Sequence, residues 1–298
     1  MGAADKEFAK EAADALLEDL TTDFGVPERV HYAAGVLLDA DDFGAEQRYG
    51  RGRLARALSA LHGYGTVAGL KVALAADPAQ RETGHLEVAP GLALDRYGRL
   101  IELRRSQCIN AADWLAQKAA QPEEKRQAVL DALNPARTEL ALAVQIRFAV
   151  CRHGVTPAFA AGPFNATDYV VPSRLADAFE LVLVPRQLAA PAAAGAPFRA
   201  FAALLAAPPA SDAELHAALV KLVIEDSPFP RAANAQGDTL PWMLLAHVNL
   251  PVRDAQVGGQ AFVEADPGAL KSRPDAELVA NGVRPLAFNL WHWQNLPK

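Results

Sequence analysis

The sequence predicts an α+β fold, in which N-terminal helices are followed by a mainly antiparallel sheet and, after an Ala/Pro-rich linker, by a smaller C-terminal α/β segment. Three patterns predict it: helical spacing of apolar residues before residue 64, alternation with period two after it, and Ala and Pro dominating residues 189–197. The chain therefore divides into a helical region (1–64), a β-rich core module (65–188), a linker (189–210) and a C-terminal helix–strand region with a Trp-rich tail (211–298).

Two helices are expected in the first region. The first carries an apolar stripe over residues 8–20. The second begins after Asp39, which can cap it together with Asp42, and it ends near Gly63. We expect its inward face to be a stripe whose members are three and four residues apart, namely Phe43, Gln47, Gly50, Leu54, Leu58 and Leu61.

A small antiparallel meander is expected next. Residues 67–74 alternate as one strand, 86–88 form a short one, and 100–103 form another. Gly98 suits the tight turn before the last of these, and Asp95 can cap that turn through its side chain.

Longer strands follow. The clearest covers 140–150, with an unbroken alternation that would span more than about 30 Å. A second strand, 179–184, is expected to pair with it antiparallel after a long loop. Residues 242–250 alternate as a strand that Pro251 should stop, and 261–263 form a short strand.

Three further helices are expected between and after these strands. Asn110 can cap the first of them, and the second covers 123–133. Ser211 and Glu214 have the spacing of a capping box for the third.

Composition excludes several classes of protein. The net charge of −6 argues against a nucleic-acid partner, and no apolar run is long enough for a membrane span. Cys108 and Cys151 are the only cysteines, so a disulfide framework is excluded and a reducing compartment fits.

Catalytic and metal-binding motifs are missing from the sequence. It has no Gly-x-Ser-x-Gly elbow, no phosphate-binding Gly-rich loop and no His-Glu-x-x-His. Cys151 and His153 could be zinc ligands, but two partners are lacking, and a small buried cysteine at a strand end is the simpler interpretation. Asp41 and Asp42 are explained by helix capping rather than acid–base chemistry. We therefore expect no enzyme, no metal, no cofactor and no small-molecule substrate.

Two further groups of side chains leave alternatives open. The arginines of the second helix could contact phosphates or form a solvated face; they are Arg48, Arg51, Arg53 and Arg56. Trp291 and Trp293, which would be costly to leave in water, either pack on the chain's own core or anchor a neighbour, and they form a candidate interface.

Spaced motifs over residues 32–103 carry a resemblance. They are Tyr32-x-x-Gly35-x-Leu-Leu, Asp42-Phe43-x-x-Glu46-Gln47-x-Tyr49, Leu-His62-Gly63-x-Gly65-x-Val-x-Gly69-Leu and Pro90-Gly91-x-Ala-x-Asp95-x-x-Gly98-Arg99-x-Ile. A further block consists of Phe148-Ala-Val-Cys151, Pro172-Ser173-Arg174 and Phe179-Glu180. A weaker pattern consists of Leu244-Leu245-Ala246-x-Val248-x-Leu250, followed by Asn281 and Arg284-Pro285. With this set the chain resembles a poorly characterised protein family found with components of phage tails and contractile injection systems.

The resemblance implies a structural protein, a virion component of the baseplate or tail end of a phage-tail-like particle. Its partners would be other tail or baseplate subunits, bound by protein–protein interaction. It would reside in the bacterial cytoplasm during assembly and then form part of the particle. The motif residues then have scaffold roles and no catalytic ones. Family members often carry more cysteines in the loop before the Pro-Ser-Arg motif, whereas residues 158–171 have none. The alternatives are a tail-fibre adaptor or receptor- or glycan-binding module that uses the Trp pair, and a cell-wall hydrolase, which would need a paired acid and base.

Overall fold

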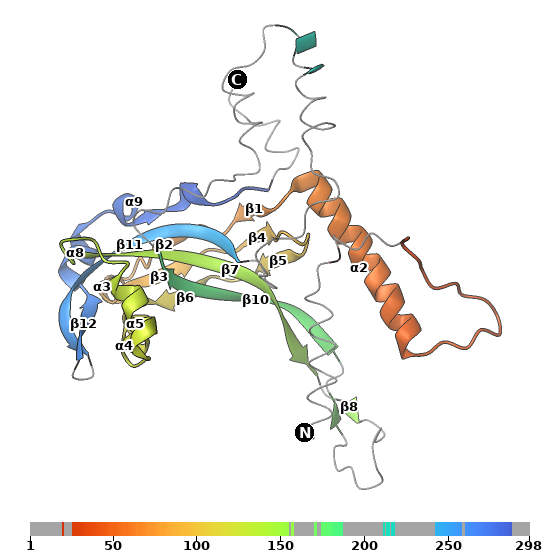
Figure 1. The fold of residues 1–298 in the computed structure, drawn as a ribbon, viewed down its shortest axis with the longest axis horizontal. Helices are drawn as coiled ribbons and strands as arrows, with labels where there is room; N and C mark the ends of the chain where they lie inside the picture. Colours follow the sequence, from red (N-terminus) through yellow and green to blue (C-terminus); the bar gives the residue numbers. More distant parts are fainter. Residues whose placement is uncertain are drawn as a thin grey trace.

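The computed structural model describes residues 20, 26–154, 156–157, 170–171, 174–186, 211, 213–214, 216–217, 242–257 and 260–287. These residues form helices and antiparallel sheets (Figure 1), which confirms the predicted α+β class. The helix expected over 8–20, apart from Leu20, lies outside the described residues, as do the linker and the Trp pair.

The largest sheet has the strand order β10-β7-β11-β12, with the short strand β13 paired to β11. Its strands are β7 (Glu139–His153), β10 (Arg174–Pro185), β11 (Met243–Val257), β12 (Gln260–Ala265) and β13 (Val279–Ala280). β7 and β10 pair antiparallel, with Phe148 opposite Phe179. This confirms the pairing that the alternating pattern and the long connection predicted.

The expectation that Pro251 ends its strand is wrong, because β11 continues through it. Proline lacks the N–H that a central strand needs on one side. Pro251 lies opposite Glu139, the first residue of β7, and Val252 begins the pairing with β12 opposite Ala265. Proline therefore stands where β11 exchanges one partner for the other, and its carbonyl still accepts a hydrogen bond from the Asp266 N–H at 3.0 Å.

Two three-stranded sheets, β1-β4-β5 and β2-β3-β6, replace the single meander. Their strands are β1 (Gly65–Gly69), β2 (Val72–Leu74), β3 (His85–Val88), β4 (Gly91–Leu94), β5 (Leu100–Leu103) and β6 (Gln107–Asn110). The continuous strand expected over 67–74 is therefore wrong. Gly69 and Leu70, with φ of +65° and +55°, break it. Leu70 is nevertheless fully buried, so the apolar alternation runs across the break.

Short helices and strands connect the sheets. They are α3 (Pro78–Glu82), α4 (Ala111–Ala119), α5 (Glu123–Leu130), α8 (Pro267–Ser272), α9 (Asp275–Leu278), the 3₁₀ helix η2 (Asn281–Val283), β8 (Thr156–Pro157) and β9 (Val170–Val171). Asn110 caps α4 as expected, because its side chain accepts from the N–H groups of Ala112 and Asp113. The Ser211 hydroxyl likewise accepts from the Glu214 N–H at 3.3 Å.

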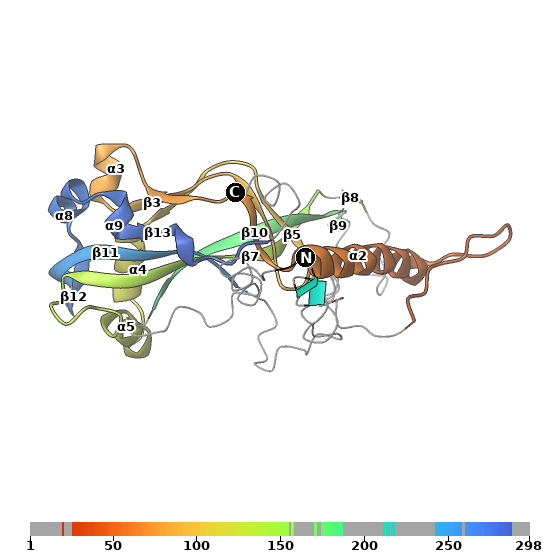
Figure 2. The ribbon, with the colours of Figure 1, turned by 90° about the horizontal axis from the view of Figure 1, so that it is seen from above.

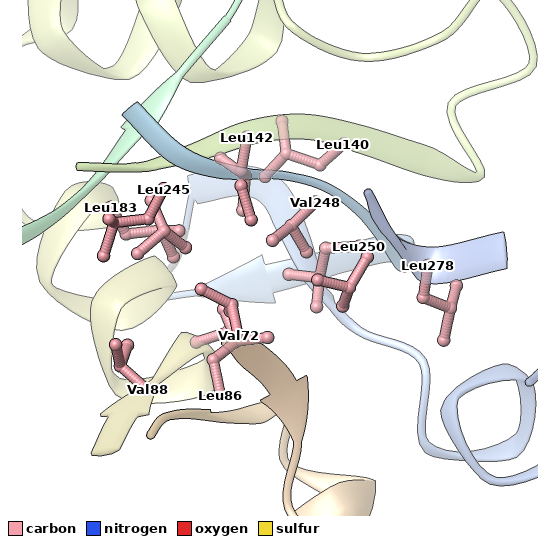
Figure 3. Packing of buried hydrophobic residues seen from close by; sticks show 14 of the residues in the cluster. Val72, Leu86, Val88, Leu140, Leu142, Leu183, Leu245, Val248, Leu250 and Leu278 are labelled. Atoms are coloured by element: carbon pink, nitrogen blue, oxygen red, sulfur yellow. The ribbon is translucent and has the colours of Figure 1, made fainter. Parts of the chain in front are cut away.

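The hydrophobic core lies between the β2-β3-β6 sheet and the largest sheet. Figure 3 shows Val72, Leu86 and Val88 pointing towards side chains of β7 and β11, among them Leu142 and Val248. All five of these side chains are buried. Since burying a Leu or Val side chain stabilises the fold by about 1.5–3 kcal/mol, this contact holds the two sheets together.

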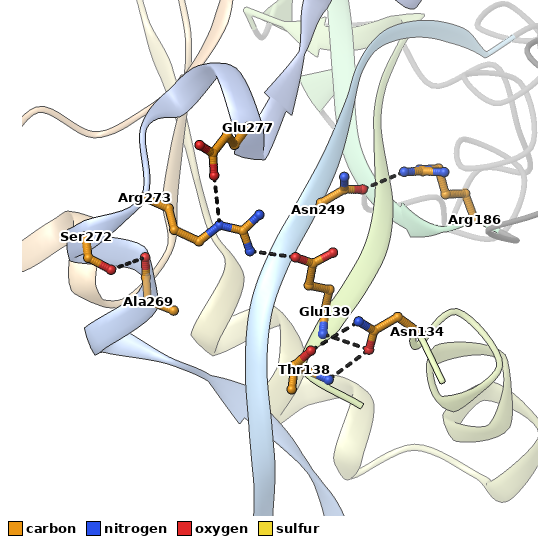
Figure 4. A network of polar contacts seen from close by, with 9 residues as sticks. All are labelled: Asn134, Thr138, Glu139, Arg186, Asn249, Ala269, Ser272, Arg273 and Glu277. Atoms are coloured by element: carbon orange, nitrogen blue, oxygen red, sulfur yellow. Dashed lines mark hydrogen bonds and ion pairs between the residues drawn. The ribbon is translucent and has the colours of Figure 1, made fainter. Parts of the chain in front are cut away.

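Polar contacts fasten the C-terminal region to the same sheet (Figure 4). The Arg273 guanidinium donates to the Glu139 carboxylate at 2.6 Å and to that of Glu277 at 3.4 Å. Arg186, at the end of β10, donates to the Asn249 side chain in β11 at 2.6 Å. Residues beyond the linker thus share one sheet and one hydrophobic core with residues 65–188.

One helix, α2 (Ala40–His62), projects from this body. Figure 1 shows its C-terminal end beside β1, and Figures 1 and 2 both show its N-terminal end pointing away from the sheets. The preceding segment loops out beyond that end, and residues 26–28 lie alongside the helix, where they line a pocket with Tyr49 and Gly52. We call residues 26–62 the arm. The helix matches the predicted bounds, and its place outside the sheets raises the question of what holds it there.

Candidate functional site

Helix α2 begins at a side-chain cap that the sequence predicted. The Asp39 side chain accepts hydrogen bonds from the N–H groups of Asp41 and Asp42, at 2.9 and 3.1 Å. The Asp42 carboxylate accepts in return from the Asp39 N–H at 3.0 Å. This reciprocal capping box starts the helix with the side chains of Asp39 and Asp42.

The β4–β5 turn is built around one buried carboxylate. Asp95 is 1% exposed and accepts from the N–H groups of Tyr97 and Arg99, each at 2.9 Å. The Arg99 guanidinium also pairs with it at 2.6 Å. Burial raises the pKa of Asp95, and the charge and hydrogen bonds of Arg99 act in the opposite direction. Asp95 is thus the turn cap predicted from sequence, and its hydrogen-bond partners, Tyr97 and Arg99, belong to the same turn.

Arg99 also connects this turn to the largest sheet. Its guanidinium stacks over the Tyr97 ring at 4.8 Å and over the Phe148 ring at 4.9 Å, measured to the ring centroids. Phe148 belongs to β7. A desolvated cation held between two aromatic faces and a carboxylate fixes the turn against the body of the protein.

The arm is docked directly onto the same turn. Gly98 has a φ of +70°, and a Cβ atom there would lie 2.7 Å from the carbonyl carbon and 2.9 Å from the Cα of Ala55 in α2. Carbon atoms do not approach so closely, and the left-handed backbone disfavours other residues as well. Ala55 and Ser59 are the buried residues of α2. The helix therefore rests by its small residues on the backbone of the β4–β5 turn.

A second set of polar groups secures the break between β1 and β2. The Asn281 side chain donates to the Val72 carbonyl and accepts from its N–H, both at 2.9 Å, as a neighbouring strand would. Arg284 donates to the Leu70 carbonyl at 2.7 Å and to that of Gly69 at 3.4 Å. Burial lowers the pKa of Arg284. Both residues were singled out by the resemblance alone, and no local pattern revealed these contacts.

The outer face of α2 carries apolar residues that the sequence pattern predicted to face inward, so that prediction is wrong. Phe43, Leu54 and Leu61 were expected to face inward, but they are 55%, 60% and 74% exposed. The helix docks through Ala55 and Ser59, which lie elsewhere on its circumference. Apolar periodicity identifies a face that avoids water, but it cannot distinguish the chain's own core from a partner.

The exposed apolar residues are concentrated on the arm. Seven of the nine large hydrophobic side chains that are exposed within the described residues belong to it: Val26, Tyr32, Val36, Leu37, Phe43, Leu54 and Leu61. The other two are Leu100 and Leu286. Sequence reasoning missed the contribution of residues 26–38, although the apolar run Ala33–Leu38, which contains no charge, was a usable signal.

The remaining motif residues lie around these contacts. Gly63 ends α2, Gly65 and Gly69 bound β1, and Pro90 and Gly91 lead into β4. Tyr32, Gly35 and Gln47 are exposed on the arm, whereas Glu46, Tyr49 and His62 are half-buried. The motif block as a whole therefore shapes the arm and the turns that carry it.

Among the described ranges, no group of three or more His, Cys, Asp or Glu side chains could hold a metal ion. Cys108 and Cys151 are free thiols, and both are exposed, so the expectation of a buried cysteine at position 151 is wrong. Cys151 lies near the end of β7, where the strand extends beyond the core.

Within the described part of the chain, no helix is both long and apolar enough to cross a membrane. The candidate functional site is the arm. Its helix is capped by Asp39 and Asp42, rests on the β4–β5 turn at Gly98, and carries exposed apolar side chains on its outer face. Comparison with known proteins adds no family: the chain matches no protein-family model and no curated protein.

Proposed function

We propose that the chain is a non-enzymatic structural subunit of a phage-tail-like particle, a baseplate or tail-end component that binds neighbouring subunits through its arm. The observation that carries the proposal is the concentration of exposed apolar side chains on the arm. Exposed apolar side chains gathered on one projecting element are typical of protein–protein contacts. The particle class comes from the resemblance over residues 32–103.

The contacts of the motif residues support an assembly role. Asp95 and Arg99 bond to each other and to their own turn, and Gly98 makes room for the backbone of α2. Asp39 and Asp42 start the helix. A motif block that serves to place a projecting helix is expected of a docking module.

The two alternatives have less support. A hydrolase needs an acid and a base that face a substrate, and Asp95, the most deeply buried carboxylate of the motif block, is enclosed by Arg99 and the turn backbone. The glycan-binding alternative depends on Trp291 and Trp293, which lie outside the described residues. We therefore retain the structural assignment.

The proposal is tested by expressing the complete gene cluster and purifying particles on a density gradient. The chain should co-sediment with the particles, and Phe43→Asp should reduce its incorporation several-fold. Leu100→Asp, which changes an exposed leucine on β5, is the matched control and should incorporate normally. Complete particles that lack the chain would contradict the proposal.

A further inference from the structure

The outer face of α2 has the seven-residue repeat of a helix–helix seam. The exposed residues at alternating spacings of four and three are Phe43, Gln47, Gly50, Leu54, Ala57 and Leu61. Glycine weakens a helix, yet a Cβ atom at Gly50 would meet nothing within 4 Å. Nothing in the described chain therefore requires a glycine there, whereas a second helix that crosses closely at this point would.

Two charged residues flank this stripe on the same side, Glu46 nearer the start of the helix and Arg53 nearer its end. In an antiparallel pair this flank of each helix faces the same flank of the other, so the acid of one copy lies beside the base of the other. In a parallel pair it faces the opposite flank, where Arg51 already has a contact within its own chain.

We propose that two copies of the chain pair antiparallel along α2, with Phe43 of each beside Leu54 of the other and Gln47 of each beside Gly50 of the other. Residues 40–57 then overlap. At 100° per residue, Glu46 and Arg53 lie on the same flank of the stripe, so each Glu46 faces Arg53 of the second copy. Twofold symmetry makes each contact twice. The inference rests on the proposed function, because it names the partner of the arm.

The contact area determines how the pair must be studied. The overlap is about 27 Å long and about 10 Å wide, which gives about 270 Å² per copy. Standard interfaces bury about 800 Å² per partner, so the pair should be weak and dependent on concentration in free solution. Sedimentation velocity of the full chain over a wide concentration range, in reductant because both cysteines are exposed, is the suitable measurement.

The first pair of variants tests the stripe. Leu54→Asp should abolish the dimer, because it places a carboxylate beside Phe43 of the second copy. Leu100→Asp is the matched control, since Leu100 is also an exposed leucine but lies on β5, and it should leave the dimer unchanged. Both positions are exposed, so neither change removes core packing, and circular dichroism confirms folding.

A charge-reversal cycle tests the register. Glu46→Arg and Arg53→Glu should each weaken the dimer about tenfold at low salt, since each creates two like-charged contacts. The double variant should recover most of that loss, because the pairs are restored with reversed sign. A parallel pair, or a different protein on the stripe, gives no such recovery.

Three results would overturn the proposal: a chain that stays monomeric at every concentration, a dimer that Leu54→Asp leaves intact, and a double reversal that recovers nothing. A monomer in which a cysteine at position 54 resists maleimide would show that another segment of the same chain covers the stripe, and would overturn it too. A monomeric chain that still enters particles refutes the pairing alone. A dimer that never enters particles refutes the proposed function and retains the pairing.

Discussion

Replacing Gly98 by alanine tests how the arm is attached. The new Cβ atom would lie 2.7 and 2.9 Å from two backbone carbons of Ala55, so α2 has to move away from the β4–β5 turn. The left-handed backbone costs an alanine about 1–2 kcal/mol. Overpacking a fitted contact adds about 1–3 kcal/mol. The free energy of unfolding should therefore fall by about 2–5 kcal/mol.

The control for Gly98→Ala is the same change at Gly44. Gly44 lies in α2, where a Cβ atom would meet nothing within 4 Å. Alanine there should stabilise the protein by about 1 kcal/mol, because glycine is a poor helix former. Urea denaturation measures both changes, and amide hydrogen exchange should show α2 losing protection in Gly98→Ala alone. Equal stability of Gly98→Ala and the wild type, with α2 still protected, would refute the docking described here.

Three more changes test the polar contacts. Asp95→Ala leaves a buried arginine and two buried N–H groups without their acceptor, and urea denaturation should show the free energy of unfolding falling by about 3–5 kcal/mol. Asp254→Ala, which removes an exposed ion pair, is the control and should lower it by under about 1 kcal/mol. Similar losses in the two variants would contradict this account. Asn281→Ala removes both hydrogen bonds to the backbone of β2, and thermal unfolding should show the free energy of unfolding falling by about 1–3 kcal/mol. An unchanged unfolding midpoint would mean that the pairing of Asn281 with β2 is dispensable. Burial and the charge of Arg186 lower the pKa of His247 below its ordinary value of 6.5. The unfolded chain therefore binds the proton more readily, and the free energy of unfolding falls as the pH drops below about 6.5. His247→Gln should flatten this pH dependence, and an unchanged pH profile in the variant would contradict the role given to His247.

Local chemistry made much of the fold predictable from sequence. Asp39, Asp95 and Asn110 act through hydrogen bonds to residues at most four positions away, so their spacing alone identified the caps. The alternation over 140–150 identified β7 because period two has one physical explanation over that length.

Non-local contacts were beyond sequence reasoning. The sequence pattern does not reveal the break at Leu70, because Leu70 is buried and so continues the apolar alternation. The backbone at the break is bound by Arg284, which lies far along the chain. Pro251 was misjudged because its tolerance depends on two partner strands exchanging at that residue.

The candidate site was predicted only in part. The pattern identified the capped helix and five residues that share its exposed face, whereas Leu58, the sixth, is half-buried; the five are Phe43, Gln47, Gly50, Leu54 and Leu61. It assigned the stripe to the wrong environment, because the docking face consists of small residues such as Ala55, whose burial is visible only against the turn at Gly98. An amphipathic pattern carries no information about which apolar surface its stripe will meet.

The central claim is that the outer face of α2 is covered by protein in the assembled particle. It is tested most directly by maleimide labelling of a cysteine placed at Leu54, in a chain whose Cys108 and Cys151 are serine, with a cysteine at Leu100 for comparison. The cysteine at position 54 should react readily in the isolated chain at low concentration and be protected in particles, while the one at position 100 reacts in both. Equal reactivity at position 54 in the two states would contradict the claim.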